Sequence, residues 1–110
     1  MTYVFDIDGT ICATNGSDYE NSEPMAERIG VVNKLYEQGN TIFFLTARGM
    51  GRTLNKQAEA HGLLYDLTLQ QLNNWGVKFH RLFLGKPAGD IYVDDRGSKD
   101  DAFFAKWSIE

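Results

Sequence analysis

Two carboxylates, Asp6 and Asp8, directly follow a short apolar run and are the first side chains in this sequence that could do chemistry. The run Tyr3-Val4-Phe5 is typical of a buried strand, and Gly9-Thr10 breaks the extended pattern. An unpaired carboxylate at a buried strand end is energetically unfavourable. Binding a hard divalent cation such as Mg²⁺ is one way to stabilise the pair, and a carboxylate there could also attack phosphorus.

Three later apolar runs end in side chains that complement these carboxylates. The run 41–45 is followed by Thr46, the run 81–84 by Lys86, and the run 90–93 by Asp94-Asp95. Carboxylates suit a cation, whereas a hydroxyl and an ammonium group suit an anion. The combination is typical of a site for a phosphoryl group bridged to Mg²⁺, where catalysis consists mostly of positioning and charge stabilisation.

The elements that must position these residues alternate between strands and helices. The predicted order is strand 3–5, a loop over 12–24, a helix from about Pro24 to Gly39, strand 41–45, helices 52–61 and 63–75 with Gly62 between them, strands 81–84 and 90–93, and a helix 99–107 capped by Ser98. This alternation predicts one α/β domain over 1–110, with a mostly parallel sheet flanked by helices on both faces. The carboxyl ends of parallel strands share one edge, so the four polar strand ends should converge.

Bulk composition restricts the possible partners. The chain has 110 residues, 43% of them hydrophobic, and a net charge of −4, which disfavours broad affinity for nucleic acid or anionic membranes. No apolar stretch is long enough to span a bilayer, and Met1 leads directly into the first strand, so we expect no signal peptide and no membrane. The lone cysteine, Cys12, fits a cytoplasmic location and is expected to fill space rather than to act as a nucleophile.

The motif order resembles that of the haloacid dehalogenase (HAD) superfamily of phosphatases. Asp6-Ile7-Asp8-Gly9-Thr10 is similar to the first HAD motif, Thr46 to the second, Lys86 to the third, and Asp94-Asp95 to the fourth. The four motifs occur in order and span residues 4–97, nearly the whole chain. The resemblance implies a Rossmann-like HAD core and a Mg²⁺-dependent phosphomonoester hydrolase.

The resemblance also assigns roles to these residues. Asp6 would be the nucleophile and a metal ligand, and Asp8 the general acid and base whose backbone carbonyl also contacts the metal. Thr46 and Lys86 would hold the phosphoryl oxygens. The remaining metal ligands would be Asp94 and Asp95, the latter directly or through water.

The intervals between motifs are too short for the cap domain that many HAD relatives carry. One loop and one helix separate Thr10 from Thr46. We therefore expect a capless core with an open site, shaped by the loop 12–23 or by a lid from a neighbouring subunit in a homo-oligomer. Other candidate substrate contacts beside this opening are Thr10, Ala47, Arg48 and Arg96.

Two substrate classes remain open. The stretches Leu45–Gly49 and Gly85–Arg96 are similar to small capless phosphatases of capsule and surface-polysaccharide biosynthesis, which implies a sugar phosphate. The Thr-Ala-Arg-Gly turn and the Asp-Asp-Arg ending also resemble the phosphatase half of polynucleotide kinase-phosphatases. With 11 basic and 15 acidic residues the sugar phosphate is preferred, although a basic cluster would favour the polynucleotide 3′-phosphatase. Its members would be Arg48, Arg52, Lys56 and Arg96.

Two alternatives belong to other functional classes. Receiver domains of bacterial signalling have this size and use an aspartyl-phosphate with Mg²⁺, but their acidic pair comes early and their acceptor aspartate lies on a middle strand. Here Asp-x-Asp comes first and the adjacent pair last. The other alternative is a non-catalytic domain that binds a metal or a partner, and no expected catalytic position is lost.

Overall fold

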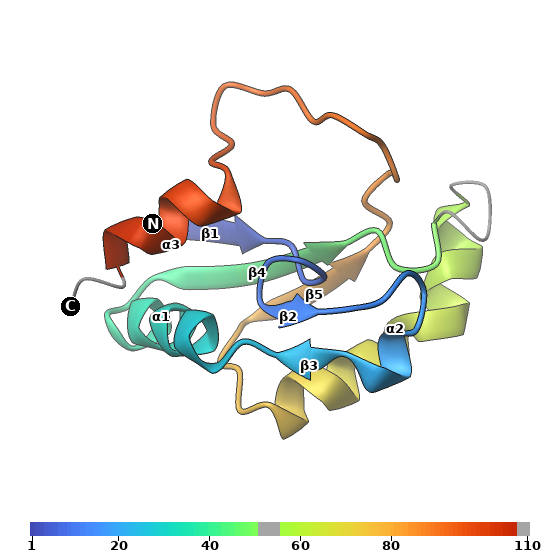
Figure 1. The fold of residues 1–110 in the computed structure, drawn as a ribbon, viewed down its shortest axis with the longest axis horizontal. Coiled ribbons are helices and arrows are strands. Elements are labelled where there is room, and N and C mark those ends of the chain that lie inside the picture. The colour runs from blue at the N-terminus through green and yellow to red at the C-terminus, as the bar shows by residue number, and fades with distance from the viewer. Residues whose placement is uncertain (51–55, 108–110) are drawn as a thin grey trace.

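The computed structural model describes residues 1–50 and 56–107. Its elements, shown in Figure 1, are β1 (Thr2–Phe5), β2 (Cys12–Ala13), the 3₁₀ helix η1 (Tyr19–Asn21), β3 (Glu23–Pro24), α1 (Ala26–Glu37), β4 (Thr41–Thr46), α2 (Gln57–Asn74), β5 (Arg81–Leu84) and α3 (Asp100–Trp107). The order confirms an α/β chain in which strands of the main sheet are connected through helices. In the part of the chain that the structure describes, no helix has the length and apolarity needed to cross a bilayer.

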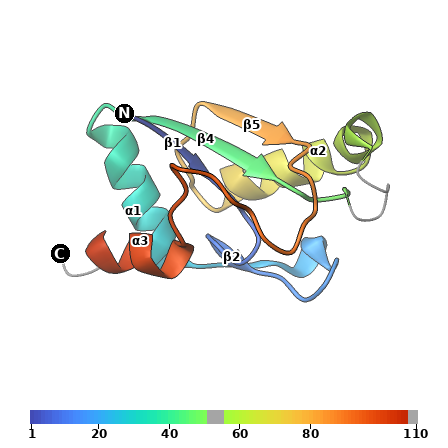
Figure 2. The same ribbon diagram turned by 90° about the horizontal axis from the view of Figure 1, so that it is seen from above.

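A three-stranded parallel sheet is the centre of the fold. Its strand order is β1-β4-β5, and Figure 2 shows the three strands side by side. Phe5 pairs with Phe44 in the register of β1 and β4, and Thr46 pairs with Leu84 in that of β4 and β5. All three strands therefore end at the same edge, as the sequence predicts.

The buried side chains of the sheet alternate along each strand and point to one face. Ile42, Phe44 and Thr46 are buried in β4, whereas the residues between them are only partly covered. Helices α1 and α2 lie on this buried face. The helix residues that complete the core are Ile29, Val32, Leu35, Leu64 and Leu72.

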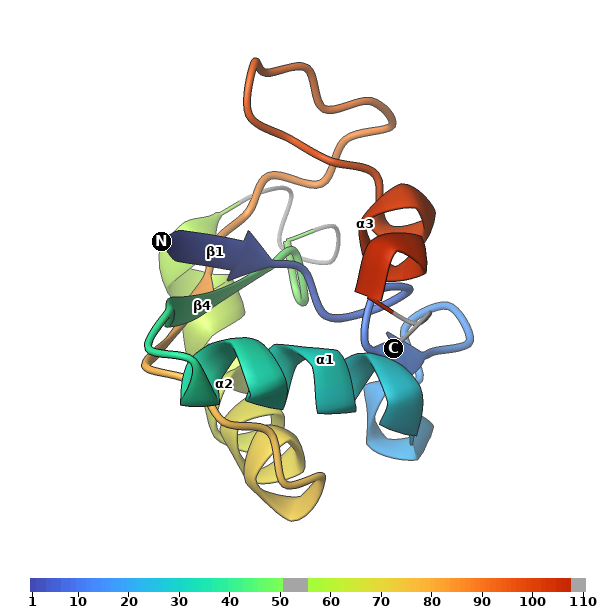
Figure 3. The same ribbon diagram turned by 90° about the vertical axis from the view of Figure 1, so that its left-hand side faces the viewer.

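The opposite face of the sheet is largely open in the described part of the chain. Val4 of β1 is 59% exposed and Phe83 of β5 is 41% exposed, and Figure 3 shows α1 and α2 together on the other side. Both helices connect neighbouring parallel strands in the same direction across the sheet, and right-handed connections of that kind place helices on one face. The prediction that helices cover both faces of the sheet is therefore wrong, because the face that carries Val4 and Phe83 has no helix on it in the described part of the chain.

The second helical region is one helix rather than two. Sequence patterning predicts a break at Gly62, but α2 runs without interruption from Gln57 to Asn74. An isolated glycine in a helix interior lowers helix propensity by only about 1 kcal/mol, which tertiary packing overrides. Leu64 and Leu72, at helical spacing on either side of Thr68, are buried and supply that packing. Residues 52–55 of the predicted first helix lie outside the described residues.

Residues 90–93, predicted as a fourth strand, form no strand. The segment from Gly85 to Lys99 is a loop that leaves the sheet on the side opposite α1 and α2 (Figure 1). Ile91 and Val93 within it are 82% and 91% exposed. A β-forming pattern reports how well side chains fit a pleated, half-buried surface, and no strand pairs with this segment to provide one.

Helix α3 closes the fold beside β1. It begins at Asp100, two residues beyond the predicted cap Ser98. Phe104 is buried and its ring lies 6.0 Å from that of Phe5. Arg28 of α1 fixes the start of α3, with Nη1 2.8 Å from Asp100 Oδ2.

Residues 12–24, predicted as a loop without structure, contain three short elements. β2 and β3 pair in antiparallel fashion, with Cys12 opposite Pro24, and η1 lies between them. None of the residues of η1 is buried. We call residues 12–24 the β2–β3 segment. It follows the carboxyl end of β1 and so lies beside the predicted site.

Candidate active site

Asp6 and Lys86 meet at the carboxyl edge of the sheet. Asp6 follows β1 directly and Lys86 lies two residues beyond β5, and Lys86 Nζ is 3.7 Å from Asp6 Oδ2. Burial raises the pKa of Asp6 more than the backbone hydrogen bond from Ile7 and the charge of Lys86 lower it. Asp6 is thus a half-buried carboxylate beside an ammonium group. This pair is one that the sequence predicts.

The end of β4 holds Lys86 in place through its backbone. The carbonyl oxygen of Thr46 accepts hydrogen bonds from the amides of Gly85 and Lys86, both at 3.2 Å. Gly85 has φ +110°, a conformation that residues with a Cβ rarely adopt. The chain therefore turns sharply after β5, and Lys86 comes to lie across the end of β4 from Asp6.

The Asp-x-Asp-Gly-Thr stretch folds into a tight turn anchored in the core. Ile7 and Ile11 are completely buried, and the carbonyl oxygen of Ile7 accepts hydrogen bonds from the amides of Thr10 and Ile11. Gly9 at φ +78° permits this turn. Because Ile7 points into the core, the carboxylates on either side of it are kept at the edge.

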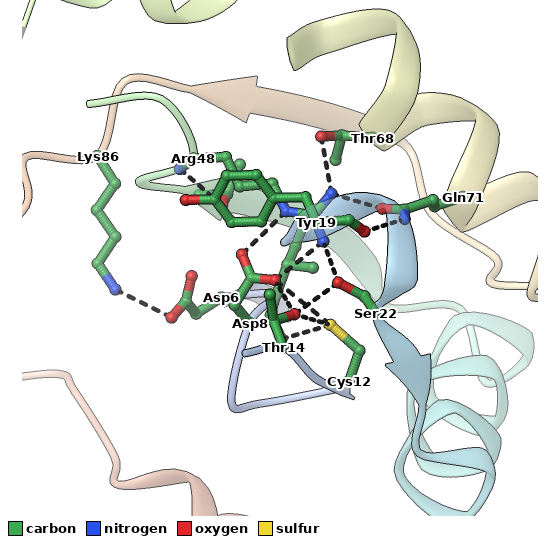
Figure 4. Close-up of polar contacts among 12 residues, drawn as sticks. Asp6, Asp8, Cys12, Thr14, Tyr19, Ser22, Arg48, Thr68, Gln71 and Lys86 are labelled. Atoms are coloured by element: carbon green, nitrogen blue, oxygen red, sulfur yellow. Dashed lines mark hydrogen bonds and ion pairs between the residues drawn. The ribbon is translucent and has the colours of Figure 1, made fainter. Parts of the chain in front are cut away.

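Asp8 is bound by donors from two segments of the chain, the turn after β4 and the β2–β3 segment. Arg48 Nε donates to Oδ2 and Arg48 Nη2 to Oδ1, both at 2.9 Å, and Thr14 Oγ1 donates to Oδ1 at 2.6 Å. Figure 4 shows this network on one side of the site and the Asp6–Lys86 pair on the other. The buried thiol of Cys12 also lies 3.6 Å from Oδ1.

These contacts determine the charge of Asp8. Burial raises the pKa of its carboxyl, but the hydrogen bonds from Arg48 and Thr14 outweigh burial and hold the pKa below its ordinary value. An ionised carboxylate can accept a proton but has none to donate. In this arrangement Asp8 is therefore an ionised carboxylate that can accept a proton, although its lowered pKa makes it a weaker base. Burial raises the pKa of the Cys12 thiol, which fits a cysteine that is not a nucleophile.

The other residues that the sequence predicts as substrate contacts are engaged with partners within the protein. Thr46 is buried, and its hydroxyl oxygen accepts a hydrogen bond from the backbone amide of Arg48 at 3.2 Å. Arg48 has a fully buried side chain committed to protein partners. The carbonyl oxygen of Thr10 accepts from Arg28, and that of Ala47 accepts from the amide of Met50.

Asp94, Asp95 and Arg96 are not brought to the other site residues. They lie in the exposed loop after β5, where Asp94 Oδ1 accepts hydrogen bonds from the amides of Arg96 and Gly97. Among the described residues no three carboxylate, histidine or cysteine side chains are grouped closely enough to hold a metal. The expected ligands Asp6, Asp8, Asp94 and Asp95 therefore do not form a site that fits Mg²⁺ in this arrangement.

Sequence reasoning missed the polar residues that surround Arg48. Thr68 and Gln71 of α2 accept hydrogen bonds from Arg48 Nη1, and the ring of Tyr19 lies against the guanidinium, 4.8 Å from ring centre to Cζ. Thr68 and Gln71 are three residues apart on the buried side of the helix, and polar residues there are a signal for a buried partner. Thr14 and Tyr19 lie in a segment without periodicity, which carries no comparable signal.

Comparison with known proteins supports the fold. No family model matches the chain, and no curated protein matches it. A crystal structure of a structural-genomics target from Vibrio cholerae is similar, with a TM-score of 0.86 and 25% sequence identity. The similarity covers 94% of this chain and 87% of the Vibrio chain. That protein carries no functional name, so the comparison supports the α/β architecture and leaves the activity to be argued from the site.

Proposed function

We propose that this protein is a phosphomonoester hydrolase of the HAD type that acts through an aspartyl-phosphate on Asp6. The observation that carries the proposal is the pairing of Asp6 with Lys86, 3.7 Å apart at the ends of two parallel strands. A carboxylate nucleophile beside a cation is the minimum needed to bring a negatively charged phosphoryl group to an attacking oxygen. The assignment to the HAD superfamily rests on the order of the motifs in the sequence and is part of the proposal.

The proposed reaction has two steps. Asp6 attacks phosphorus, the bond from phosphorus to the ester oxygen breaks, and the alcohol leaves with a proton. Water then attacks the phosphorus of the aspartyl-phosphate, and inorganic phosphate and the free carboxylate are regenerated. Lys86 and Thr46 stabilise the phosphoryl oxygens in both steps. Asp8 is proposed to take the proton from the attacking water in the second step, which its ionised form can accept, and to give that proton to the leaving oxygen of the next substrate molecule.

Mg²⁺ remains the proposed cofactor, although the described arrangement does not form its site. Asp6 is the proposed ligand at the strand end, and Asp94 and Asp95 lie on the loop after β5. When bound, the ion would supply positive charge to the phosphoryl oxygens. The loop would have to approach Asp6 for its carboxylates to contribute. Assays must therefore compare Mg²⁺ with its removal by a chelator.

The proposed substrate is a small phosphorylated molecule, with a sugar phosphate preferred. The alternative polynucleotide 3′-phosphatase would need a basic surface that tracks a nucleic-acid backbone. Arg48, one expected member of such a surface, is fully buried and bound to Asp8. Arg52, another member, lies outside the described residues. The burial of Arg48 favours the sugar phosphate, in a cytoplasmic enzyme whose open site could receive a lid from a second copy.

A phosphate-release assay tests the proposal. Purified protein with Mg²⁺ is given sugar phosphates, nucleotides and 3′-phosphorylated oligonucleotides in turn. We expect release from sugar phosphates, and loss of that release in Asp6→Asn but not in Asp66→Asn, a control at an exposed position on α2. No release from any substrate would contradict the enzyme proposal. A stable aspartyl-phosphate formed from small phosphodonors would instead favour the receiver-like alternative, and metal binding without either reaction the non-catalytic one.

A further inference from the structure

The side chain of Arg48 is fully buried, and all three of its nitrogens have protein partners. Nε and Nη2 bind the two oxygens of Asp8, and Nη1 binds Thr68 and Gln71 of α2. Nη2 is also 3.5 Å from Ser22 Oγ. A guanidinium has five N–H groups in a fixed plane, so its partners are fixed in direction as well as distance. In this arrangement Arg48 has no donor left for a substrate.

The same guanidinium holds the β2–β3 segment. The ring of Tyr19 lies against it, and the backbone carbonyl of Tyr19 accepts a hydrogen bond from Gln71 Nε2. Thr14 links Asp8 to Ser22, since its hydroxyl lies 2.6 Å from both Asp8 Oδ1 and Ser22 Oγ. Figure 4 shows Tyr19, Ser22 and Thr14 gathered around Arg48 and Asp8.

The apolar anchors of the β2–β3 segment are few: Cys12 is buried in the core, and the ring of Tyr19 packs against the core. Its 3₁₀ helix contains no buried residue, and the β2–β3 pairing involves only two residues from each strand. Segments with few buried apolar contacts open at low free energy. Buried polar networks in which every member is satisfied make such a segment rigid. Beyond Cys12, the position of the β2–β3 segment therefore depends largely on the polar contacts around Arg48.

We propose that Arg48 is a positioning residue that orients the Asp8 carboxylate and, through Tyr19, Ser22 and Thr14, holds the β2–β3 segment beside the site. The consequence for turnover rests on the proposed function, whereas the consequence for the segment does not. Arg48 thus shapes the leaving-group side of the site without touching the substrate. Substrates that extend toward the β2–β3 segment should depend on Arg48 more than compact ones.

Hydrogen exchange tests the positioning role without requiring activity. Arg48→Met keeps an unbranched stem and removes the guanidinium. We expect amide exchange of residues 12–24 to become at least about tenfold faster, because several hydrogen bonds worth about 1 kcal/mol each are lost. Exchange in the middle of α1 should become faster by no more than the loss of global stability, measured by urea unfolding, allows. Arg48→Lys should give an intermediate result, since it keeps the charge but loses the planar pair of contacts. Unchanged exchange in the segment would overturn the proposal.

A second variant keeps the test valid if Arg48→Met does not fold. Thr14→Val removes the hydroxyl that joins Asp8 to Ser22 and leaves a side chain of similar shape in a half-buried position. Exchange of residues 12–24 should be faster by about threefold to tenfold. The control is Thr41→Val, at the end of β4 away from the site. It should leave exchange of residues 12–24 unchanged. Equal exchange in the two variants would overturn the proposal.

Kinetics separate positioning from direct substrate contact. If release from a sugar phosphate is found, Arg48→Lys and Thr14→Val should both reduce kcat/KM for it more than for p-nitrophenyl phosphate. A substrate-contacting arginine predicts that only Arg48→Lys has this effect and that residues 12–24 exchange normally, a result that would overturn the proposal. Absence of all phosphate release would contradict the proposed function, while the exchange measurements would still decide the role of Arg48.

Discussion

Arg48 binds Asp8 through two parallel hydrogen bonds, Nε to Oδ2 and Nη2 to Oδ1, each 2.9 Å long. The arginine side chain is fully buried and the carboxylate is 25% exposed. Two-pronged pairing of this kind is among the strongest charge-assisted contacts in proteins. This pair joins the turn after β4 to the turn after β1. Asp8 therefore helps to hold the site together in addition to its proposed role in proton transfer.

Removing one partner of this buried pair should destabilise the fold. Asp8→Ala leaves the guanidinium of Arg48 buried without its carboxylate, and we expect the free energy of unfolding to fall by about 2–4 kcal/mol. Asp6→Ala is the matched control, since its pair with Lys86 is partly solvated and should change stability by about 1 kcal/mol or less. Urea unfolding measures both values. A smaller loss for Asp8→Ala than for Asp6→Ala would contradict this assignment.

Lys86 should matter for turnover much more than for stability. Lys86→Met removes the cation beside Asp6 and keeps a similar stem, and we expect kcat to fall by about 10²–10³ because the phosphoryl oxygens lose a charge partner. Its stability should change by about 1 kcal/mol or less. Lys78→Met is the control, since Lys78 forms an exposed pair with Glu37 away from the strand ends. Comparable activity in the two variants would remove Lys86 from the site.

The pairing of α1 with α3 should depend on pH. The hydrogen bond from Arg28 lowers the pKa of Asp100, so this carboxylate stabilises the fold above its unfolded pKa of about 3.9, and that stabilisation is lost as pH falls through the lower folded value. Asp100→Asn should therefore lower the free energy of unfolding at pH 7 by about 0.5–1 kcal/mol and by much less near pH 2.5. Urea unfolding at both pH values is the measurement.

Asp101 provides the comparison for that prediction. It also lies within 3.0 Å of Arg28, but its side chain is 76% exposed. Asp101→Asn should change stability less than Asp100→Asn at pH 7. A loss for Asp100→Asn that is equally large at both pH values would show that packing, rather than charge, explains its effect.

The main sheet and the position of the first site residues could be predicted from sequence because the signals are local and the geometry is generic. Apolar runs marked β1, β4 and β5, and parallel strands necessarily end at one edge, so Asp6 and Lys86 could be placed together. The burial of Arg48 was not predictable in this way. Its partners Tyr19 and Gln71 come from a segment without periodicity and from a helix face, and only tertiary packing joins them.

In the loop after β5, by contrast, the sequence predicts a strand that the structure does not contain. Ile91-Tyr92-Val93 has the composition of a strand, but a strand also needs a neighbour, and local sequence does not specify one. In the structure Tyr92 instead bonds back to its own loop, with its hydroxyl donating to the carbonyl of Pro87 at 2.6 Å. Its ring lies 4.3 Å from Lys86 Nζ, measured to the ring centre. The loop is thus connected to the site at Lys86 and extended away from it at Asp94.

Mg²⁺ should change the behaviour of this loop if it is the cofactor. Binding that draws Asp94 and Asp95 toward Asp6 would order the segment, so Mg²⁺ should slow chymotryptic cleavage after Tyr92, which is 53% exposed. Asp94→Asn should reduce this protection, and Asp90→Asn, earlier in the same loop, should retain it. Cleavage that is equally fast with Mg²⁺ and with a chelator would contradict a metal site completed by the loop.

The most direct test of the account is to look for the phosphoryl group on Asp6. The protein is mixed with Mg²⁺ and the best substrate from the phosphate-release assay, quenched in acid during turnover, digested with pepsin and analysed by mass spectrometry. We predict that the peptide containing Asp6 is one phosphoryl group heavier, with the addition at Asp6, and that Asp6→Asn shows neither this peptide nor phosphate release. Phosphate release by the Asp6→Asn variant, or wild-type turnover with the phosphoryl group on another residue, would contradict the account.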